Sequence, residues 1–121
     1  MKRFMLALAG ATLAAAGVTA QAQNLAAGKA AFDKAGCAVC HGADAKTPIL
    51  PEYPVLAGQY ADYLVLALRA YKRGAAEGNH AVIVRKNATM GVQIATLKSD
   101  QEIRDIAAWL SSLPSDLSTR H

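Results

Sequence analysis

The run Cys37-Ala38-Val39-Cys40-His41 constrains this chain of 121 residues more than any other feature. Its two thiols are three positions apart, close to one turn of a helix, and a histidine directly follows the second. This spacing allows both sulfurs to attach to the vinyl groups of one haem while the imidazole reaches the iron, which is the pattern of c-type haem attachment. We therefore predict that Cys37 and Cys40 bind one covalent haem c and that His41 is the proximal iron ligand.

Three other uses of this motif are open at this point. A redox-active disulfide of the thioredoxin type needs a βαβ framework, and the sequence contains no convincing strands. A zinc site needs about four ligands, and only His41, His80 and His121 add to the two cysteines. A structural disulfide that closes so short a loop would contribute little stability through entropy. Haem attachment is the interpretation that the sequence favours.

The first 22 residues have the pattern of a secretory signal peptide. Residues 1–3 are Met-Lys-Arg, residues 4–18 are almost all apolar, and residues 19–22 (Thr-Ala-Gln-Ala) have small residues at the spacing of a cleavage site. The apolar run is shorter than the ~20 residues of a membrane-spanning helix. We expect cleavage after Ala22, export to the periplasm, and a mature domain of residues 23–121 with no membrane span.

The mature part is weakly charged and poor in large core side chains. Without Lys2 and Arg3 it has 11 basic and 9 acidic side chains, a net charge of +2 that argues against nucleic acid as a partner. It keeps one Met, one Phe, one Trp and four Tyr, which is few for a core of ~100 residues. A haem would supply the missing bulk.

Hydrophobic periodicity predicts an all-α domain with three main helices. They cover residues 24–34, residues 59–73, and a segment that begins at the capping box of residues 99–102 and ends before Pro114. Gly74 is expected to end the second helix. The apolar stripe of that helix consists of Tyr60, Leu64, Ala67, Leu68 and Tyr71. The segment from Gly74 to Lys98 is interpreted as mostly loop.

Several segments together resemble the class I c-type cytochromes. The attachment motif follows the first helix closely, and residues 54–60 (Pro-Val-Leu-Ala-Gly-Gln-Tyr) and 97–110 are similar to one half of the soluble di-haem cytochromes of bacterial respiration. The resemblance covers nearly the whole mature region. It implies the cytochrome c fold, in which helices with long loops wrap around a covalently bound haem. One attachment motif implies one haem here. Between Tyr71 and Met90 the chain is several residues longer than the family pattern.

The resemblance also implies roles for residues outside the motif. Pro54 is at the position whose carbonyl accepts the Nδ1 proton of the proximal histidine, although a simple turn proline would have the same sequence. Gly28 and Phe32 match the face of the first helix that crosses the last one, at Ile106 and Trp109.

Met90 is the predicted distal iron ligand. It is the one methionine of the mature chain and lies nine residues before Ser99, where class I cytochromes have their axial methionine. Gly91 beside it would allow the backbone to approach the haem face. The main rival is His80, which would give a bis-histidine haem of lower potential, whereas His121 is at the chain terminus.

These features lead to a functional prediction of a periplasmic one-electron carrier that is not an enzyme. Its partners would be redox proteins, an electron donor and an acceptor, among which a membrane-bound oxidase or reductase is a candidate. Two alternatives are the cytochrome subunit of a periplasmic dehydrogenase or oxidase complex, and a haem-based ligand sensor with an open sixth position. The main group of basic residues consists of Arg69, Lys72, Arg73, Arg85 and Lys86. It is either a docking surface for a partner or a solvated face with cations at the end of a helix.

Overall fold

The computed structural model describes residues 24–76 and 83–115, and these ranges contain five helices and no strand. The helices are α1 (Leu25–Lys34), α2 (Cys37–His41), α3 (Ala61–Ala75), α4 (Ala88–Ala95) and α5 (Asp100–Ser112). The predicted all-α class is confirmed. The predicted signal peptide and the two rival ligands His80 and His121 lie outside the described residues.

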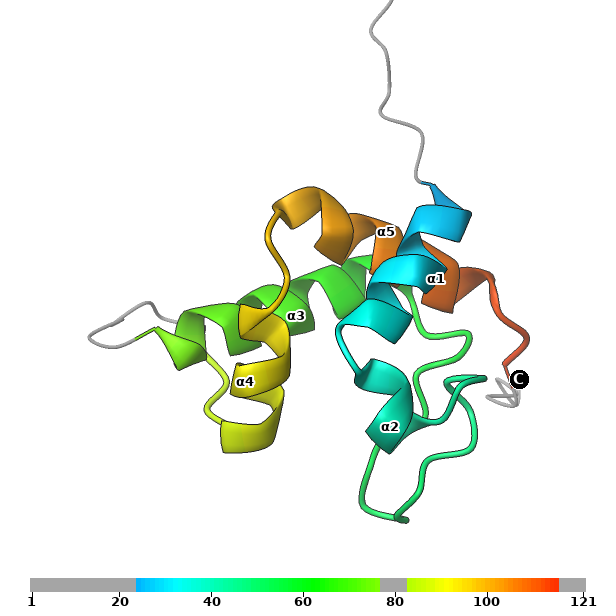
Figure 1. Cartoon of the computed structure of the whole chain (residues 1–121), viewed down its shortest axis with the longest axis horizontal. Coiled ribbons are helices and arrows are strands. Elements are labelled where there is room, and N and C mark those ends of the chain that lie inside the picture. Colours follow the sequence, from blue (N-terminus) through cyan, green and yellow to red (C-terminus); the bar gives the residue numbers. More distant parts are fainter. Residues whose placement is uncertain (1–23, 77–82, 116–121) are drawn as a thin grey trace, which may run out of the picture.

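Helices α1 and α5 cross each other and form the most extensive helix pair (Figure 1). At the crossing, a Cβ added to Gly28 would lie 2.0 Å from the backbone oxygen of Asp105 and 2.9 Å from Trp109 Cβ. Next to it, the ring centroids of Phe32 and Trp109 are 4.9 Å apart. The crossing implied by the family resemblance is therefore present.

Helix α5 begins as its sequence predicts. The Ser99 side chain accepts a hydrogen bond from the backbone N–H of Glu102, and the Glu102 carboxylate accepts one from the backbone N–H of Ser99, which completes the capping box. The buried face of the helix includes Ile103, Ile106 and Leu110.

Helix α3 differs from its prediction at both ends. Tyr60 precedes the helix as its N-cap and is 75% exposed, so it is not part of the buried stripe. Gly74 does not end the helix, which continues to Ala75. A Cβ at Gly74 would lie 2.0 Å from the carbonyl oxygen of Arg85. The backbone N–H of Arg85 donates a hydrogen bond to the carbonyl oxygen of Ala70 at 3.0 Å. Glycine is needed here because a second segment passes directly over α3.

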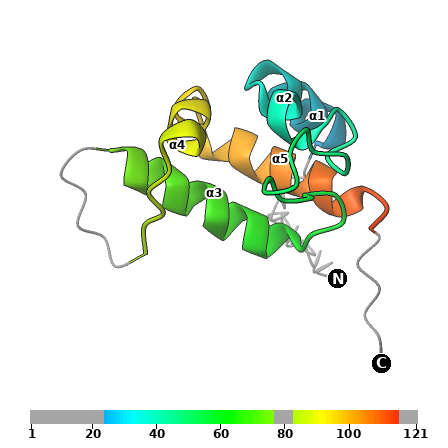
Figure 2. The same cartoon turned by 90° about the horizontal axis from the view of Figure 1, so that it is seen from below.

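Helix α4 corrects the interpretation of residues 74–98 as mostly loop. It packs on α3, as Figure 2 shows, and buries Ile94 almost completely. The sequence signal was weak because the helix is short and contains Gly91 and the β-branched Thr89 and Val92, which have low helix propensity. Packing on α3 therefore stabilises this helix, whose own helix propensity is too low to do so.

None of the helices within the described ranges combines the length and apolar character that crossing a lipid bilayer would require. The largest fully buried side chains come from α1, α4 and α5: Phe32, Ile94, Ile103, Ile106 and Leu110. All of these except Ile103 also form part of the wall of a cavity.

Candidate cofactor site

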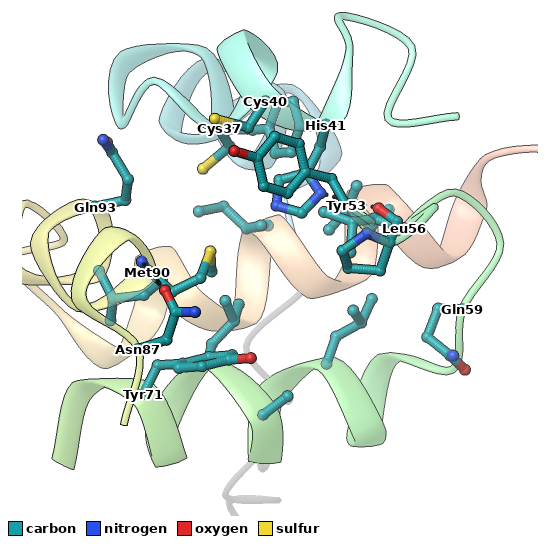
Figure 3. A pocket seen from close by; sticks show the side chains of 18 of the residues that line it. Cys37, Cys40, His41, Tyr53, Leu56, Gln59, Tyr71, Asn87, Met90 and Gln93 are labelled. Carbon is teal, nitrogen blue, oxygen red and sulfur yellow. Dashed lines mark hydrogen bonds between the residues drawn. The ribbon is translucent and has the colours of Figure 1, made fainter. Parts of the chain in front are cut away.

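A cavity of about 430 Å³ lies between α2, the loop that follows it, α3 and α4 (Figure 3). Its volume falls within the roughly 300–1,000 Å³ of sites for small molecules and cofactors. Cys37, Cys40, His41 and Met90 all line it. Residues that the sequence places in two distant segments therefore meet around one cavity.

The two cysteines are presented by the short helix α2. Gly36 has φ +72°, a left-handed conformation that turns the chain sharply between α1 and α2. Both thiols are free, and burial raises the pKa of the Cys37 thiol to about 11. Redox-active Cys-x-x-Cys pairs instead depend on a lowered cysteine pKa. The surroundings of Cys37 therefore do not favour a thioredoxin-like role.

His41 is 5% exposed and is fixed in orientation by one hydrogen bond. Its Nδ1 lies 2.9 Å from the carbonyl oxygen of Pro54. A carbonyl oxygen can only accept, so Nδ1 carries a proton, and Nε2 is the ring nitrogen that remains for a metal. The hydrogen bond that the resemblance implied for Pro54 is present, and it prepares the ring to bind a metal through Nε2.

Met90 lies in the first turn of α4, where its sulfur points into the same cavity as the His41 ring (Figure 3). The expected role of Gly91 was wrong. Gly91 is not part of the cavity wall, and a Cβ added to it would lie 3.4 Å from Ala75 Cβ. Gly91 thus lies against α3 and does not provide an approach to the haem face.

Apolar side chains form most of the remaining wall. The stripe predicted for the second helix faces the cavity through Leu64, Ala67, Leu68 and Tyr71. Core residues from three further helices complete it: Phe32, Ile94, Ile106 and Leu110. A planar apolar group held by the cysteines would therefore lie mostly against hydrocarbon.

Arg85 is a cavity residue whose position the sequence did not reveal. Its guanidinium lies 5.6 Å from the ring centroid of Tyr63 and 5.5 Å from that of Tyr71, within the range of cation–π contacts. Arg85 Nη2 donates a hydrogen bond to the Tyr63 hydroxyl at 3.3 Å, and this bond raises the pKa of Arg85. The sequence gives a basic residue but not the aromatic partners, which precede it by 14 and 22 positions.

The donor set fits a haem better than a bare metal ion. Within the described ranges, no group of three or more His, Cys, Asp or Glu side chains could hold a metal, so the zinc interpretation has no support there. One imidazole nitrogen, one thioether sulfur and two thiols at the attachment spacing are the groups that bind a haem c and its iron. The apolar walls suit the macrocycle.

Comparison with known proteins gives consistent results. Residues 25–114 match the family model Cytochrome c. The chain is 41% identical over 81 residues to cytochrome c-554(548) of Halomonas halodenitrificans, and the aligned region covers 66% of this chain and 88% of that protein. It is also 41% identical over 76 residues to cytochrome c4 of Stutzerimonas stutzeri, covering 63% of this chain but 35% of that one. The crystal structure of reduced recombinant cytochrome c4 from Pseudomonas stutzeri superposes with a TM-score of 0.66 and 36% identity, over 77% of this chain and 47% of that chain. The chain therefore spans less than half the length of these cytochromes c4.

Proposed function

Because this chain belongs to the cytochrome c family, we propose that it is a one-electron carrier that holds a single haem c in the cavity. The observation that carries this proposal is that Cys37, Cys40, His41 and Met90 line one cavity although they come from two separate elements. The single attachment motif supports a count of one haem.

In this proposal each residue has a defined role. Cys37 and Cys40 hold the haem through two thioether bonds, and His41 and Met90 bind the iron from α2 and α4. A bound haem supplies an iron that changes between the ferric and ferrous states by one electron. With His41 and Met90 both bound to the iron, no position on it would be left for a substrate, and this suits an electron carrier rather than an enzyme.

Neighbouring groups would tune the reduction potential. The Pro54 carbonyl holds the Nδ1 proton of His41 and makes the imidazole a stronger donor. The apolar wall limits access of water and so favours the less charged ferrous form, and the thioether of Met90 acts in the same direction. We therefore propose a relatively high potential.

We also propose the cellular setting from the sequence. Residues 1–22 form a signal peptide that is cleaved after Ala22, and residues 23–121 form one mono-haem domain in the periplasm. There it exchanges electrons with redox proteins.

Substitution of the distal ligand tests this function. In the holoprotein, Met90→Ala should abolish the weak sulfur-to-iron absorption band at the red end of the oxidised spectrum and lower the reduction potential. His80→Ala is the matched control and should leave both nearly intact. The opposite pattern would assign the sixth position to His80. Rapid binding of carbon monoxide to the reduced wild-type protein would contradict the simple carrier.

A further inference from the structure

We propose that Asn87 is a positioning residue for the distal ligand: its side chain fixes the first turn of α4 and thereby the place of the Met90 thioether in the cavity. The inference rests on the proposed function, because it takes Met90 to be the iron ligand. Figure 3 shows the Asn87 amide beside Met90 at the cavity.

Asn87 holds the backbone of the ligand residue through two adjacent hydrogen bonds. Its side-chain Oδ1 accepts from the N–H of Met90 at 2.8 Å, and its carbonyl oxygen accepts from the N–H of Gly91 at 2.8 Å. Its extended backbone, with φ −149° and ψ 122°, is that of an N-cap residue. The N–H of Met90 is one of the first-turn donors that have no partner within the helix, so Asn87 supplies it.

The rest of α4 provides little support at this end. Ala88 and Thr89 are exposed and Met90 is only partly buried against the core, so apolar burial holds the first turn weakly. The buried anchor, Ile94, lies one turn beyond Met90, and Gly91 contacts α3 between them. A helix of eight residues has little stability of its own. The Asn87 cap is therefore the hydrogen bond that holds the backbone of Met90 in the first turn.

If the cap is lost, the first turn frays while the later turn stays packed on α3. Fraying moves the Met90 backbone and lets the sulfur leave the iron more often, without unfolding the core. The measurable consequence is faster replacement of the thioether by an external ligand.

A threonine–valine pair isolates the capping oxygen. Asn87→Thr keeps a side-chain acceptor, whereas Asn87→Val has the same shape without one, and both β-branched residues suit the extended backbone. In the oxidised holoprotein, imidazole displaces the thioether, which is followed by loss of the red-end band. We expect displacement in Asn87→Val to be roughly fivefold faster than in Asn87→Thr, the factor by which loss of an N-cap typically shifts a helix equilibrium.

The matched control is the cap of a helix that carries no ligand. Asn24 caps α1, where its Oδ1 accepts from the N–H of Ala27 at 3.0 Å. The pair Asn24→Thr and Asn24→Val should differ in melting temperature but not in the rate of displacement. This comparison separates positioning of the ligand from general stability.

Each result supports or overturns the inference. Equal displacement rates in Asn87→Thr and Asn87→Val would overturn it, and so would a valine effect at Asn24 as large as that at Asn87. Both results leave the ligand assignment intact. A wild-type protein without the sulfur-to-iron band would overturn the ligand assignment and the inference together. Faster displacement in Asn87→Val than in Asn87→Thr, with no such difference at Asn24, would support the inference.

Discussion

At the scale of single residues, two glycines in helices differ in what a methyl group would meet. A Cβ added to Gly28 in α1 would lie 2.0 Å from the backbone oxygen of Asp105, which cannot move without separating α1 from α5. A Cβ added to Gly91 in α4 would lie 3.4 Å from Ala75 Cβ, which is an ordinary van der Waals distance. We expect Gly28→Ala to destabilise the holoprotein by about 3 kcal/mol or more. We expect Gly91→Ala to stabilise it by up to about 1 kcal/mol. Thermal unfolding followed by circular dichroism measures both, and equal effects would contradict the helix crossing described for Gly28.

Single residues also show what the sequence could predict about the site. Cys37, Cys40 and His41 were predictable because their chemistry is contained in five consecutive positions. Met90 was a candidate because residues 23–121 contain no other methionine. The contact of Arg85 with two tyrosines of α3 was not predictable, since it depends on how a later segment crosses that helix. Chemistry that is local in sequence can be predicted, and chemistry that folding assembles cannot.

At the scale of elements, the turn that follows α2 contains an acid-sensitive carboxylate. Asp44 accepts hydrogen bonds from the backbone N–H of Lys46 and from the N–H and hydroxyl of Thr47, and these lower its pKa to about 2. Ala45, the next residue, has a carbonyl oxygen that accepts from the N–H groups of Leu56 and Ala57. Asp44 therefore stabilises the turn that anchors the far end of the loop.

This lowered pKa predicts how stability depends on pH. The folded pKa is below the unfolded value near 3.8, so the contribution of Asp44 is complete above that value and is lost as the pH falls towards about 2. An asparagine at this position could still accept both backbone bonds but would not titrate. The melting temperature of Asp44→Asn should therefore fall less steeply than that of the wild type over this interval. If the melting temperatures of the variant and the wild type fell equally steeply with pH, Asp44 would not be the carboxylate responsible.

The helices also differ in how well the sequence predicted them. α1 and α5 were predicted closely because local signals, such as the Ser99 capping box, mark their ends. The end of α3 was placed two residues too early because Gly74 is a stop signal by type but allows a close approach of another segment in the fold. α4 was missed because a single asparagine cap was its local signal and packing on α3 stabilises it. The errors are in the segments whose conformation tertiary contacts decide.

At the scale of the whole molecule, the predicted basic group is less free to dock than its sequence suggests. Arg69 forms two hydrogen bonds with Asp100 at 2.7 and 2.6 Å, which link α3 to α5. Lys72 donates to the carbonyl oxygen of Leu97, and Arg73 donates to that of Ile83. These contacts favour the interpretation as helix-end cations over a dedicated docking surface.

Because these basic side chains are held by contacts within the protein and the net charge is small, we predict weak electrostatic steering of redox partners. The rate of electron transfer to an anionic iron–cyanide complex should change by less than about tenfold between low and high salt, below the range typical of steered association. Stopped-flow measurement over a salt series tests this. A steeper decrease would restore the docking surface as an interpretation, and Lys86 would be the first of its residues to substitute.

The whole domain should depend on its cofactor to fold, because the cavity lies within the core. Leu56, Leu68 and Tyr71 line the cavity and are only partly buried, although they pack against the core. Without a haem the protein would have to leave these partly buried side chains open to water or collapse around them, and the chain has few other large apolar groups to compensate. We predict that the chain without residues 1–22, produced in the cytoplasm where no haem is attached, has no cooperative thermal transition by circular dichroism, whereas the exported holoprotein has one. Since both proteins contain the same residues 23–121, a compact apoprotein that melts cooperatively would show that the polypeptide alone completes the core.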